Sequence, residues 1–299
     1  MSGHGSIVSP IVVSPDRTTD RGVASASRIW LGTAGWSYLP DWAGSFYPAG
    51  TSASETLARY VEAFRFVEVD STFYAAPAPT TLDRWASLLP VESRISFKAP
   101  KELVQDTALS PPEVPFGNFC GALRDRFGER LGRIVVQMPP AFLRTPMNHE
   151  AIARFVARWA SEFPLAIELR HVSWRRAAVL DLLRAHSVPL VGHDLRDVPN
   201  LDRASFNTSS KAAYIRLIGQ HDGISKDRIQ RGQPEARSWW IDRIGELVDA
   251  AVRDIYVVAN NHFEGHAPET LRVMMRDLGA AGMPVVTSSG WPDGQVRMF

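Results

Sequence analysis

Cysteine and long apolar stretches are scarce in this 299-residue chain, and each shortage excludes a class of protein. Cys120 is the one cysteine, which excludes a disulfide framework and a zinc site built from cysteines. No apolar run approaches the roughly 20 residues of a membrane-spanning helix, so we expect a cytoplasmic protein with no membrane partner. Basic and acidic residues number 33 and 32, which argues against a polybasic surface that holds DNA by charge alone.

Lysine is rare as well, because only Lys98, Lys101, Lys211 and Lys226 are lysines and the other basic residues are arginines. Arginine suits bidentate binding of phosphate. The arginines are spread along the whole chain, however, and we interpret their surplus as a coding bias rather than as a phosphate-binding surface.

The first 27 residues differ in composition from the rest of the chain. They are rich in Ser, Gly, Pro and Thr, and they lack the basic start and the apolar stretch of a secretory signal. We expect residues 1–27 to form a disordered tail and residues 28–299 to form the folded domain.

From Arg28 onward, short β-rich runs alternate with segments of helical periodicity. The predicted strands are Ile29–Thr33, Phe66–Asp70, Ile95–Lys98, Ile134–Gln137, Leu165–Leu169, Pro189–Asp194, Ala213–Leu217 and Ile255–Asn260. The predicted helices are Ser54–Phe64, Thr80–Leu89, Phe116–Leu131, Asn148–Ser161, Arg176–His186, Pro234–Ala251 and Pro268–Ala280. We expect Arg196–Lys211 to be a long loop, and the apolar run Pro284–Thr287 has no place in the repeat.

Eight strands that alternate with helices predict a parallel sheet covered by helices. Eight such units over about 270 residues favour a single closed (β/α)8 TIM-type barrel. An open doubly wound sheet is the alternative. Its dinucleotide-binding form loses support, because no Gly-x-Gly-x-x-Gly motif follows the first strand.

Polar side chains end nearly every predicted strand, where a barrel of this kind holds its active site. Alternation along a strand places Glu68 with Asp70, and Glu168 with Arg170, opposite apolar neighbours. Because the helices need the apolar face, the polar set must point into the barrel. Buried charges need partners, so we expect Glu68 and Glu168 to be balanced by Lys98 and Arg216, with Glu68 in a structural ion pair.

Residues one or two positions further out are candidates for function, because strand-end charges are where this fold keeps its chemistry. They are Asp70, Lys98, Arg170 and Arg216. Aromatic rings surround the same mouth and could stack on a sugar or a base. These aromatic residues are Trp36, Tyr38, Trp42, Phe73, Tyr74 and Trp174.

Several motifs occur in a fixed order between residues 29 and 270. They include Gly32-Thr33-Ala34-Gly35-Trp36, Glu68-Val69-Asp70-Ser71-Thr72-Phe73-Tyr74, Gln137-Met138-Pro139-Pro140, Glu168-Leu169-Arg170-His171, Tyr214-Ile215-Arg216 and Asn260-Asn261. The set resembles the YecE-like family, known as domain of unknown function 72. The resemblance implies a barrel similar in fold to phosphate- and sugar-handling barrels, and a site of the family's type, but no reaction.

Two positions depart from the pattern of that family. Val104-Gln105 stands where the family usually carries Thr-His, and Ile218 stands where it often carries His. If either histidine carries essential chemistry in the family, this chain has lost or altered that chemistry.

We predict an enzyme of the hydrolase or isomerase/lyase type that acts on a small anionic or sugar-like ligand. Lys98, Arg170 and Arg216 would anchor a phosphate or carboxylate, and Asp70 or Glu168 would be the general acid or base. His171 would relay a proton or act as a hydrogen-bond partner. The other candidates would bind the ligand, and they are Trp36, Tyr74, Gln137, Trp174, Asn260 and Asn261.

Three alternatives stay open at this point. Nucleic acid is a possible partner, in binding or in processing similar to that of barrel-fold endonucleases. A metal enzyme is the second, although the oxygen and nitrogen ligands at the strand ends show no diagnostic spacing, and we predict no metal and no other cofactor. A non-catalytic binding protein is the third.

Overall fold

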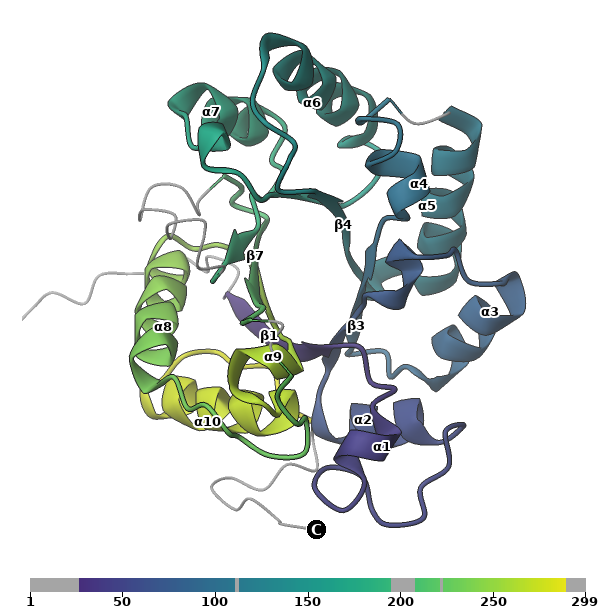
Figure 1. Ribbon diagram of the computed structural model, residues 1–299, viewed down its shortest axis with the longest axis vertical. Coiled ribbons are helices and arrows are strands. Elements are labelled where there is room, and N and C mark those ends of the chain that lie inside the picture. The colour runs from purple at the N-terminus through teal and green to yellow at the C-terminus, as the bar shows by residue number, and fades with distance from the viewer. Residues whose placement is uncertain (1–26, 111–112, 195–207, 221–222, 289–299) are drawn as a thin grey trace, which may run out of the picture.

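The computed structural model describes residues 27–110, 113–194, 208–220 and 223–288. Residues 1–26 of the predicted tail, residues 196–207 of the predicted loop at 196–211 and the last eleven residues of the chain lie outside the described residues. Within them, eight strands form one sheet in the order β5-β4-β3-β2-β1-β8-β7-β6, and every pairing is parallel. The helices surround this sheet as an outer ring (Figure 1).

The strands lie close to their predicted positions. They are β1 Arg28–Ala34, β2 Phe66–Val69, β3 Arg94–Lys98, β4 Leu131–Met138, β5 Leu165–Leu169, β6 Gly192–His193, β7 Ala212–Leu217 and β8 Asp254–Ala259. The β5–β6 seam closes the barrel through a short bridge, in which the Ile167 N–H donates to the Pro189 carbonyl and the Val191 N–H donates to the Ile167 carbonyl. The prediction of a closed barrel is therefore confirmed.

The predicted sixth strand, Pro189–Asp194, is longer than the strand observed. Pro189 has no N–H to give to a neighbouring strand. The Leu190 N–H donates instead to the buried Thr208 Oγ1, 2.8 Å away. Only Gly192 and His193 then pair with β7.

The helices follow the strands as the periodicity predicts. They are α1 Leu39–Trp42, α2 Thr56–Ala63, α3 Pro79–Leu88, α4 Lys101–Val104, α5 Glu113–Phe127, α6 Pro146–Trp159, α7 Ala177–Ala185, α8 Pro234–Asp249, α9 Asn261–Glu264 and α10 Ala267–Ala280. The short α1, α4 and α9, and the 3-10 turns Ser71–Phe73 and Val172–Trp174, were not predicted. All five directly follow strands, so they form the rim of the barrel mouth.

The helix predicted over Phe116–Leu131 ends earlier than expected. Gly128 adopts a φ of +52°, which a helix cannot continue through. A single 3-10 turn follows, and β4 begins at Leu131. The apolar run Pro284–Thr287, which has no place in the repeat, lies beside the first half of β1, where Val285 bridges to Ile29. The pairing of β1 with β2 begins further along, at Gly32.

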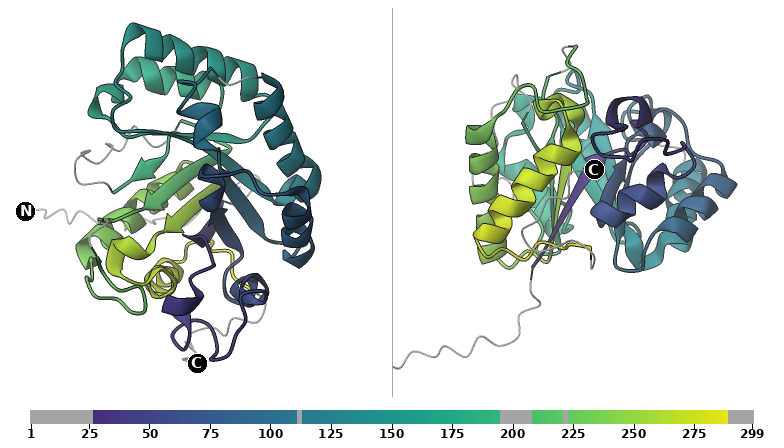
Figure 2. Two further views of the ribbon diagram at one scale, coloured as in Figure 1. Left: turned by 45° about the vertical axis from the view of Figure 1, so that its right-hand side comes forward. Right: turned by 90° about the horizontal axis from the view of Figure 1, so that it is seen from below.

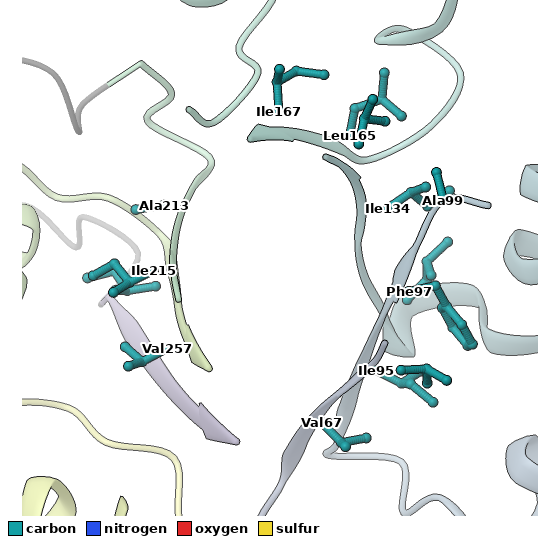
Figure 3. Close-up of a cluster of buried hydrophobic side chains, with 14 of the residues drawn as sticks. Val67, Ile95, Phe97, Ala99, Ile134, Leu165, Ile167, Ala213, Ile215 and Val257 are labelled. Carbon is teal, nitrogen blue, oxygen red and sulfur yellow. The ribbon is translucent and has the colours of Figure 1, made fainter. Parts of the chain in front are cut away.

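The apolar side chains of the strands point away from the barrel axis toward the helices. Val67, Ile95 and Phe97 on one side and Ile215 and Val257 on the other are labelled examples (Figure 3). Two further views show the helices packed around the outside of the strands (Figure 2). The interior is therefore left to the opposite set of side chains, which is polar at both ends.

Candidate functional site

Arg216 is the centre of the polar cluster at the carboxyl end of the barrel. It lies near the end of β7, 5% exposed, and points inward. One terminal nitrogen of its guanidinium lies 2.7 Å from Glu68 Oε1, and the other lies 2.7 Å from Glu168 Oε2. The second also donates to Gln137 Oε1 at 3.2 Å. One cation thus bridges two fully buried carboxylates.

Each carboxylate has a further donor. The Tyr214 hydroxyl donates to Glu68 Oε2 at 2.9 Å, and Arg170 Nε donates to Glu168 Oε1 at 2.5 Å. All four carboxylate oxygens are therefore hydrogen-bonded, as buried charges require. The alternation along the strands predicted this inward orientation for Glu68, Glu168 and Arg216.

The electrostatics of the pair follow from this geometry. Burial raises the pKa of Glu168, but the guanidinium groups of Arg216 and Arg170 outweigh it and hold that pKa well below its usual range. Burial likewise lowers the pKa of Arg216, and the carboxylates of Glu68 and Glu168 reverse that effect and raise it. Both partners are fully charged at neutral pH.

Lys98 ends β3 beside this cluster and differs from the arginines. Its side chain is buried, and its ammonium lies 4.0 Å from the centroid of the Phe73 ring. Lys98 forms no ion pair with a carboxylate of the described residues. Glu68 pairs with Arg216, and Glu168 pairs with Arg216 and Arg170. Burial, and next the charge of Arg216, lower the pKa of Lys98 to about 8.

Asp70 follows β2 at the rim and is partly exposed. A Cβ added to Gly35 would lie 3.3 Å from Asp70 Oδ1 and 3.4 Å from the Tyr38 ring, so the three residues converge. Gly35 has a φ of +79°, a conformation that suits glycine and lets β1 turn tightly beneath them. Burial first, and then the charge of Asp70, raise the pKa of the Tyr38 phenol.

Other candidates lie apart from this cluster and hold the rim in place. Trp36 is buried against Trp85 in an edge-to-face contact, with 5.2 Å between ring centroids. Trp174 is buried against Phe142, to whose carbonyl its indole N–H donates at 2.6 Å. The buried Asn261 side chain accepts hydrogen bonds from Trp42 and Ala267. All three side chains are buried.

Three more candidates stand at the ends of the short helices. The side chain of Asn260 accepts from the His262 N–H and caps α9. The ring of His171 accepts from the Ser173 N–H at the start of a 3-10 turn. Tyr74 is 75% exposed and packs edge-to-face on Phe73.

The sequence placed His193 at a strand end, among the possible ligands of the metal-enzyme alternative, but not among the catalytic or ligand-binding residues. It lies on β6 opposite Arg216, and its ring hydrogen-bonds to the Leu169 carbonyl. Burial lowers its pKa, against the opposing effect of Glu168, so the ring is neutral at physiological pH. Its Nδ1 is buried and has no hydrogen-bond partner in the described part of the chain. The only sequence signal was its place at a strand end.

The positions that depart from the family pattern have clear structural roles. Gln105 Nε2 donates to the Gln137 carbonyl at 2.7 Å and so ties α4 to the end of β4. The Ile218 N–H donates to Asp194 Oδ1 at 2.5 Å, which joins the ends of β6 and β7. Both contacts fix the backbone of strands that carry the cluster.

Metal binding and membrane insertion can be checked against the described residues. They contain no group of three or more His, Cys, Asp or Glu side chains arranged to hold a metal ion. None of their helices is both long enough and apolar enough to cross a bilayer.

Comparison with known proteins places the chain among uncharacterised barrels. The model of the family described as "Protein of unknown function DUF72" matches residues 30–295. The UPF0759 protein YunF of Bacillus subtilis is 24% identical over 275 residues, which cover 83% of this chain and 93% of that protein. The UPF0759 protein YecE of Escherichia coli K12 is 28% identical over 143 residues, 48% of each chain.

Solved structures agree on the fold. The crystal structure of a DUF72 family protein from Thermotoga maritima superposes with a TM-score of 0.70 at 24% identity, covering 84% of this chain and 99% of that one. A DUF72 family protein from Enterococcus faecalis superposes with a TM-score of 0.67 at 18% identity, covering 88% and 99%. The resemblance predicted from the motifs is confirmed.

Proposed function

The chain belongs to the DUF72 family of proteins of unknown function, and from the site of this member we propose an enzyme that applies acid–base chemistry to a small anionic or sugar-like ligand. The ligand would bind at the carboxyl ends of the strands, over the cluster centred on Arg216. Catalytic residues of barrels of this fold come from the ends of several different strands.

The observation that carries the proposal is positive charge left over after the buried carboxylates are satisfied. Arg170 uses Nε for Glu168, and its two terminal nitrogens have no partner within the described ranges. Its side chain is 18% exposed, so these nitrogens can be reached from solvent. Together with the ammonium of Lys98 they offer charge-assisted donors to a phosphate or a carboxylate.

Asp70 supports the acid–base part of the proposal. It is the carboxyl group of the mouth that accepts no side-chain or backbone hydrogen bond from the described residues, and it is partly open to solvent. Glu168 is unsuited to the same role, because its pKa is held too low for it to carry a proton at neutral pH. Asp70 is therefore our proposed general acid or base.

A titration with inorganic phosphate tests the anion site. Phosphate should raise the melting temperature, by about 1.4 kcal/mol of stabilisation at ~10 times its Kd. Arg170→Met should abolish this rise, whereas the exposed Arg176→Met should keep it. No rise up to tens of millimolar phosphate, about the range in which a ~mM site must appear, would reject an anion-handling function.

Nucleic-acid processing is the second candidate, and the exposed ring of Tyr74 favours it. A ring that is 75% exposed at the mouth can stack on an unpaired base. Filter binding of single-stranded DNA against salt tests it. Binding that weakens steeply with salt and is lost in Tyr74→Ala would support this function, and a slope near zero would reject it.

A further inference from the structure

Lys98 is the one side chain of the carboxyl-end cluster whose nitrogen has neither an ion pair nor a hydrogen bond within the described residues. Its carbonyl is fixed by the Thr72 hydroxyl, which donates to it at 2.7 Å, so the strand end that carries it is held in place. A primary amine that is buried, close to a guanidinium and without a carboxylate partner is the arrangement in which lysine acts as a nucleophile.

We propose that Lys98 forms a covalent imine with the carbonyl carbon of its substrate, and that the substrate is a small aldehyde or ketone carrying a carboxylate or a phosphate. This inference rests on the proposed function, because Arg170 would hold the anionic group while Lys98 attacks the carbonyl. It goes further by naming the nucleophile, the intermediate and the functional group that reacts.

The step balances with the groups of the mouth and one proton. The lone pair of neutral Lys98 Nζ forms a bond to the carbonyl carbon, and the carbonyl π pair moves to oxygen, which takes a proton. The resulting hydroxyl group takes a second proton and leaves as water while the C=N bond forms. One proton comes from the amine itself and one from an acid, so amine, carbonyl and one proton give a protonated imine and water.

Asp70 is placed to handle those protons. Val69, the residue before it, pairs with Phe97, the residue before Lys98, so Asp70 and Lys98 follow neighbouring strands at the same level. Its carboxyl group is not committed to an arginine, unlike those of Glu68 and Glu168. We assign its carboxylate the relay of the proton that Lys98 Nζ loses on attack to the carbonyl oxygen, and the second proton, which lets the hydroxyl leave, comes from water.

The surroundings of Nζ make a neutral amine available and also accommodate a cationic product. Burial and Arg216 lower the pKa of Lys98 to about 8, which makes a neutral amine available near physiological pH. The protonated imine is a flat cation, which can lie on the face of the Phe73 ring that already receives the ammonium. The charges of Glu168 and Glu68 attract positive charge at the same place.

Reductive trapping tests the inference, and the scarcity of lysine makes it sharp. The protein is incubated at pH 8 with glyoxylate, a small aldehyde with a carboxylate, and with cyanoborohydride. Labelling is then mapped by mass spectrometry. The internal controls are Lys101, three residues further on, and Lys211, both of which are exposed. We expect Lys98 to be labelled at least about tenfold faster than either, because an ordinary lysine is almost wholly protonated at that pH.

Acetaldehyde carries no carboxylate, so a comparison of the two aldehydes separates the reactivity of the Lys98 amine from anion binding at Arg170. The preference for Lys98 should be smaller with acetaldehyde than with glyoxylate, and inorganic phosphate should suppress only the glyoxylate reaction. Arg170→Met should bring the two aldehydes to the same preference. Lys98→Arg should remove the label while Lys101→Arg keeps it, and each variant is checked for a single cooperative melting transition above the temperature of the labelling reaction.

The outcomes distinguish the inference from the function on which it rests. Labelling of Lys98 no faster than that of Lys101, in a protein that phosphate still stabilises, overturns the imine and leaves the anion site standing. Fast labelling of Lys98 with no effect of phosphate or of Arg170→Met overturns the anionic substrate class. Loss of both the phosphate effect and the preference for Lys98 overturns the inference and the proposed function together.

Discussion

The two ends of the barrel interior both contain arginine, but they accommodate it in different ways. At the carboxyl end, Arg216 lies between two buried carboxylates. At the amino end, Arg133 is also buried, yet its Nε has no hydrogen-bond partner within the described residues, and burial lowers its pKa. Arg94 there lies 4.7 Å from the centroid of the Trp30 ring.

Asp254 is a buried carboxylate at the amino end. Asp254 accepts from the Trp30 indole N–H at 2.9 Å and forms ion pairs with Arg28 and Arg253, both of which are substantially exposed. The two ends are separated by an aromatic layer of Phe66, Tyr214 and Tyr256, whose ring centroids lie 5.0 to 6.3 Å apart. At the carboxyl end, buried arginines are thus neutralised by buried carboxylates in an ion-pair lattice of Glu68, Glu168, Arg170 and Arg216. At the amino end, the arginines are stabilised instead by aromatic ring faces and by solvent.

Removing the central cation from each end should give the largest contrast. Arg216→Met leaves two buried carboxylates without their shared partner and should cost about 3–5 kcal/mol of stability at pH 7. Arg133→Met removes a guanidinium that lacks a carboxylate and should cost less than about 1 kcal/mol. Urea denaturation of both variants measures the difference. Equal losses of stability in the two variants would mean that the ion pairs of Arg216 contribute nothing to stability beyond the packing of its side chain.

The pH dependence of stability should come from the carboxyl end. The folded pKa of Glu168 is lowered, so its contribution is present above the unfolded pKa of about 4.3 and is lost as the pH falls below it. Wild-type stability should therefore drop between about pH 5 and pH 2 more steeply than that of Glu168→Gln. Parallel curves for the two proteins would show that Glu168 is not held ionised by the arginines.

A third comparison removes the hydroxyl group from each of the two tyrosines of the aromatic layer, Tyr214 and Tyr256. Tyr214→Phe removes the donor to Glu68 Oε2 and should cost about 1–2 kcal/mol, because a buried carboxylate oxygen loses its partner. Tyr256→Phe, whose hydroxyl makes no hydrogen bond to any described residue, should cost no more than about 0.5 kcal/mol. Thermal unfolding of the two variants under one buffer compares them, and a reversed order would contradict the assignment of the carboxylate contact.

The strands and their inward residues could be predicted because alternation is a local rule. Once the helices claim Val67 and Ile167, Glu68 and Glu168 have only the interior to occupy. The rule stops where a strand stops. Trp36 and Trp174 follow strands by a few residues, but Gly35, with a φ of +79°, turns the chain before Trp36, and a 3-10 turn contains Trp174, and both rings are buried.

The roles of His193 and Tyr38 could not be predicted by the same rule. Their roles depend on residues of other strands: Glu168 and Leu169 beside His193, and Asp70 beside Tyr38. The expectation that Lys98 helps to neutralise the glutamates also needed the structure. Sequence alone offered two cations for two carboxylates, and only the geometry showed that Arg216 and Arg170 take all four oxygens with the help of Tyr214.

Lys98→Met should cost no stability at pH 7, and that makes it informative. If Lys98 neutralised a glutamate, its loss would expose a buried charge and cost several kcal/mol, as for Arg216. In the structure it has no such partner, and its pKa is lowered to about 8, so folding disfavours its charged form. The folded pKa lies below the unfolded value, so this cost is fully present below about pH 8 and disappears as the pH rises toward about 10.5. We expect Lys98→Met to be as stable as wild type or up to about 2 kcal/mol more stable at pH 7. The gain should vanish near pH 10, and a loss of stability at pH 7 would place Lys98 back within the ion-pair lattice.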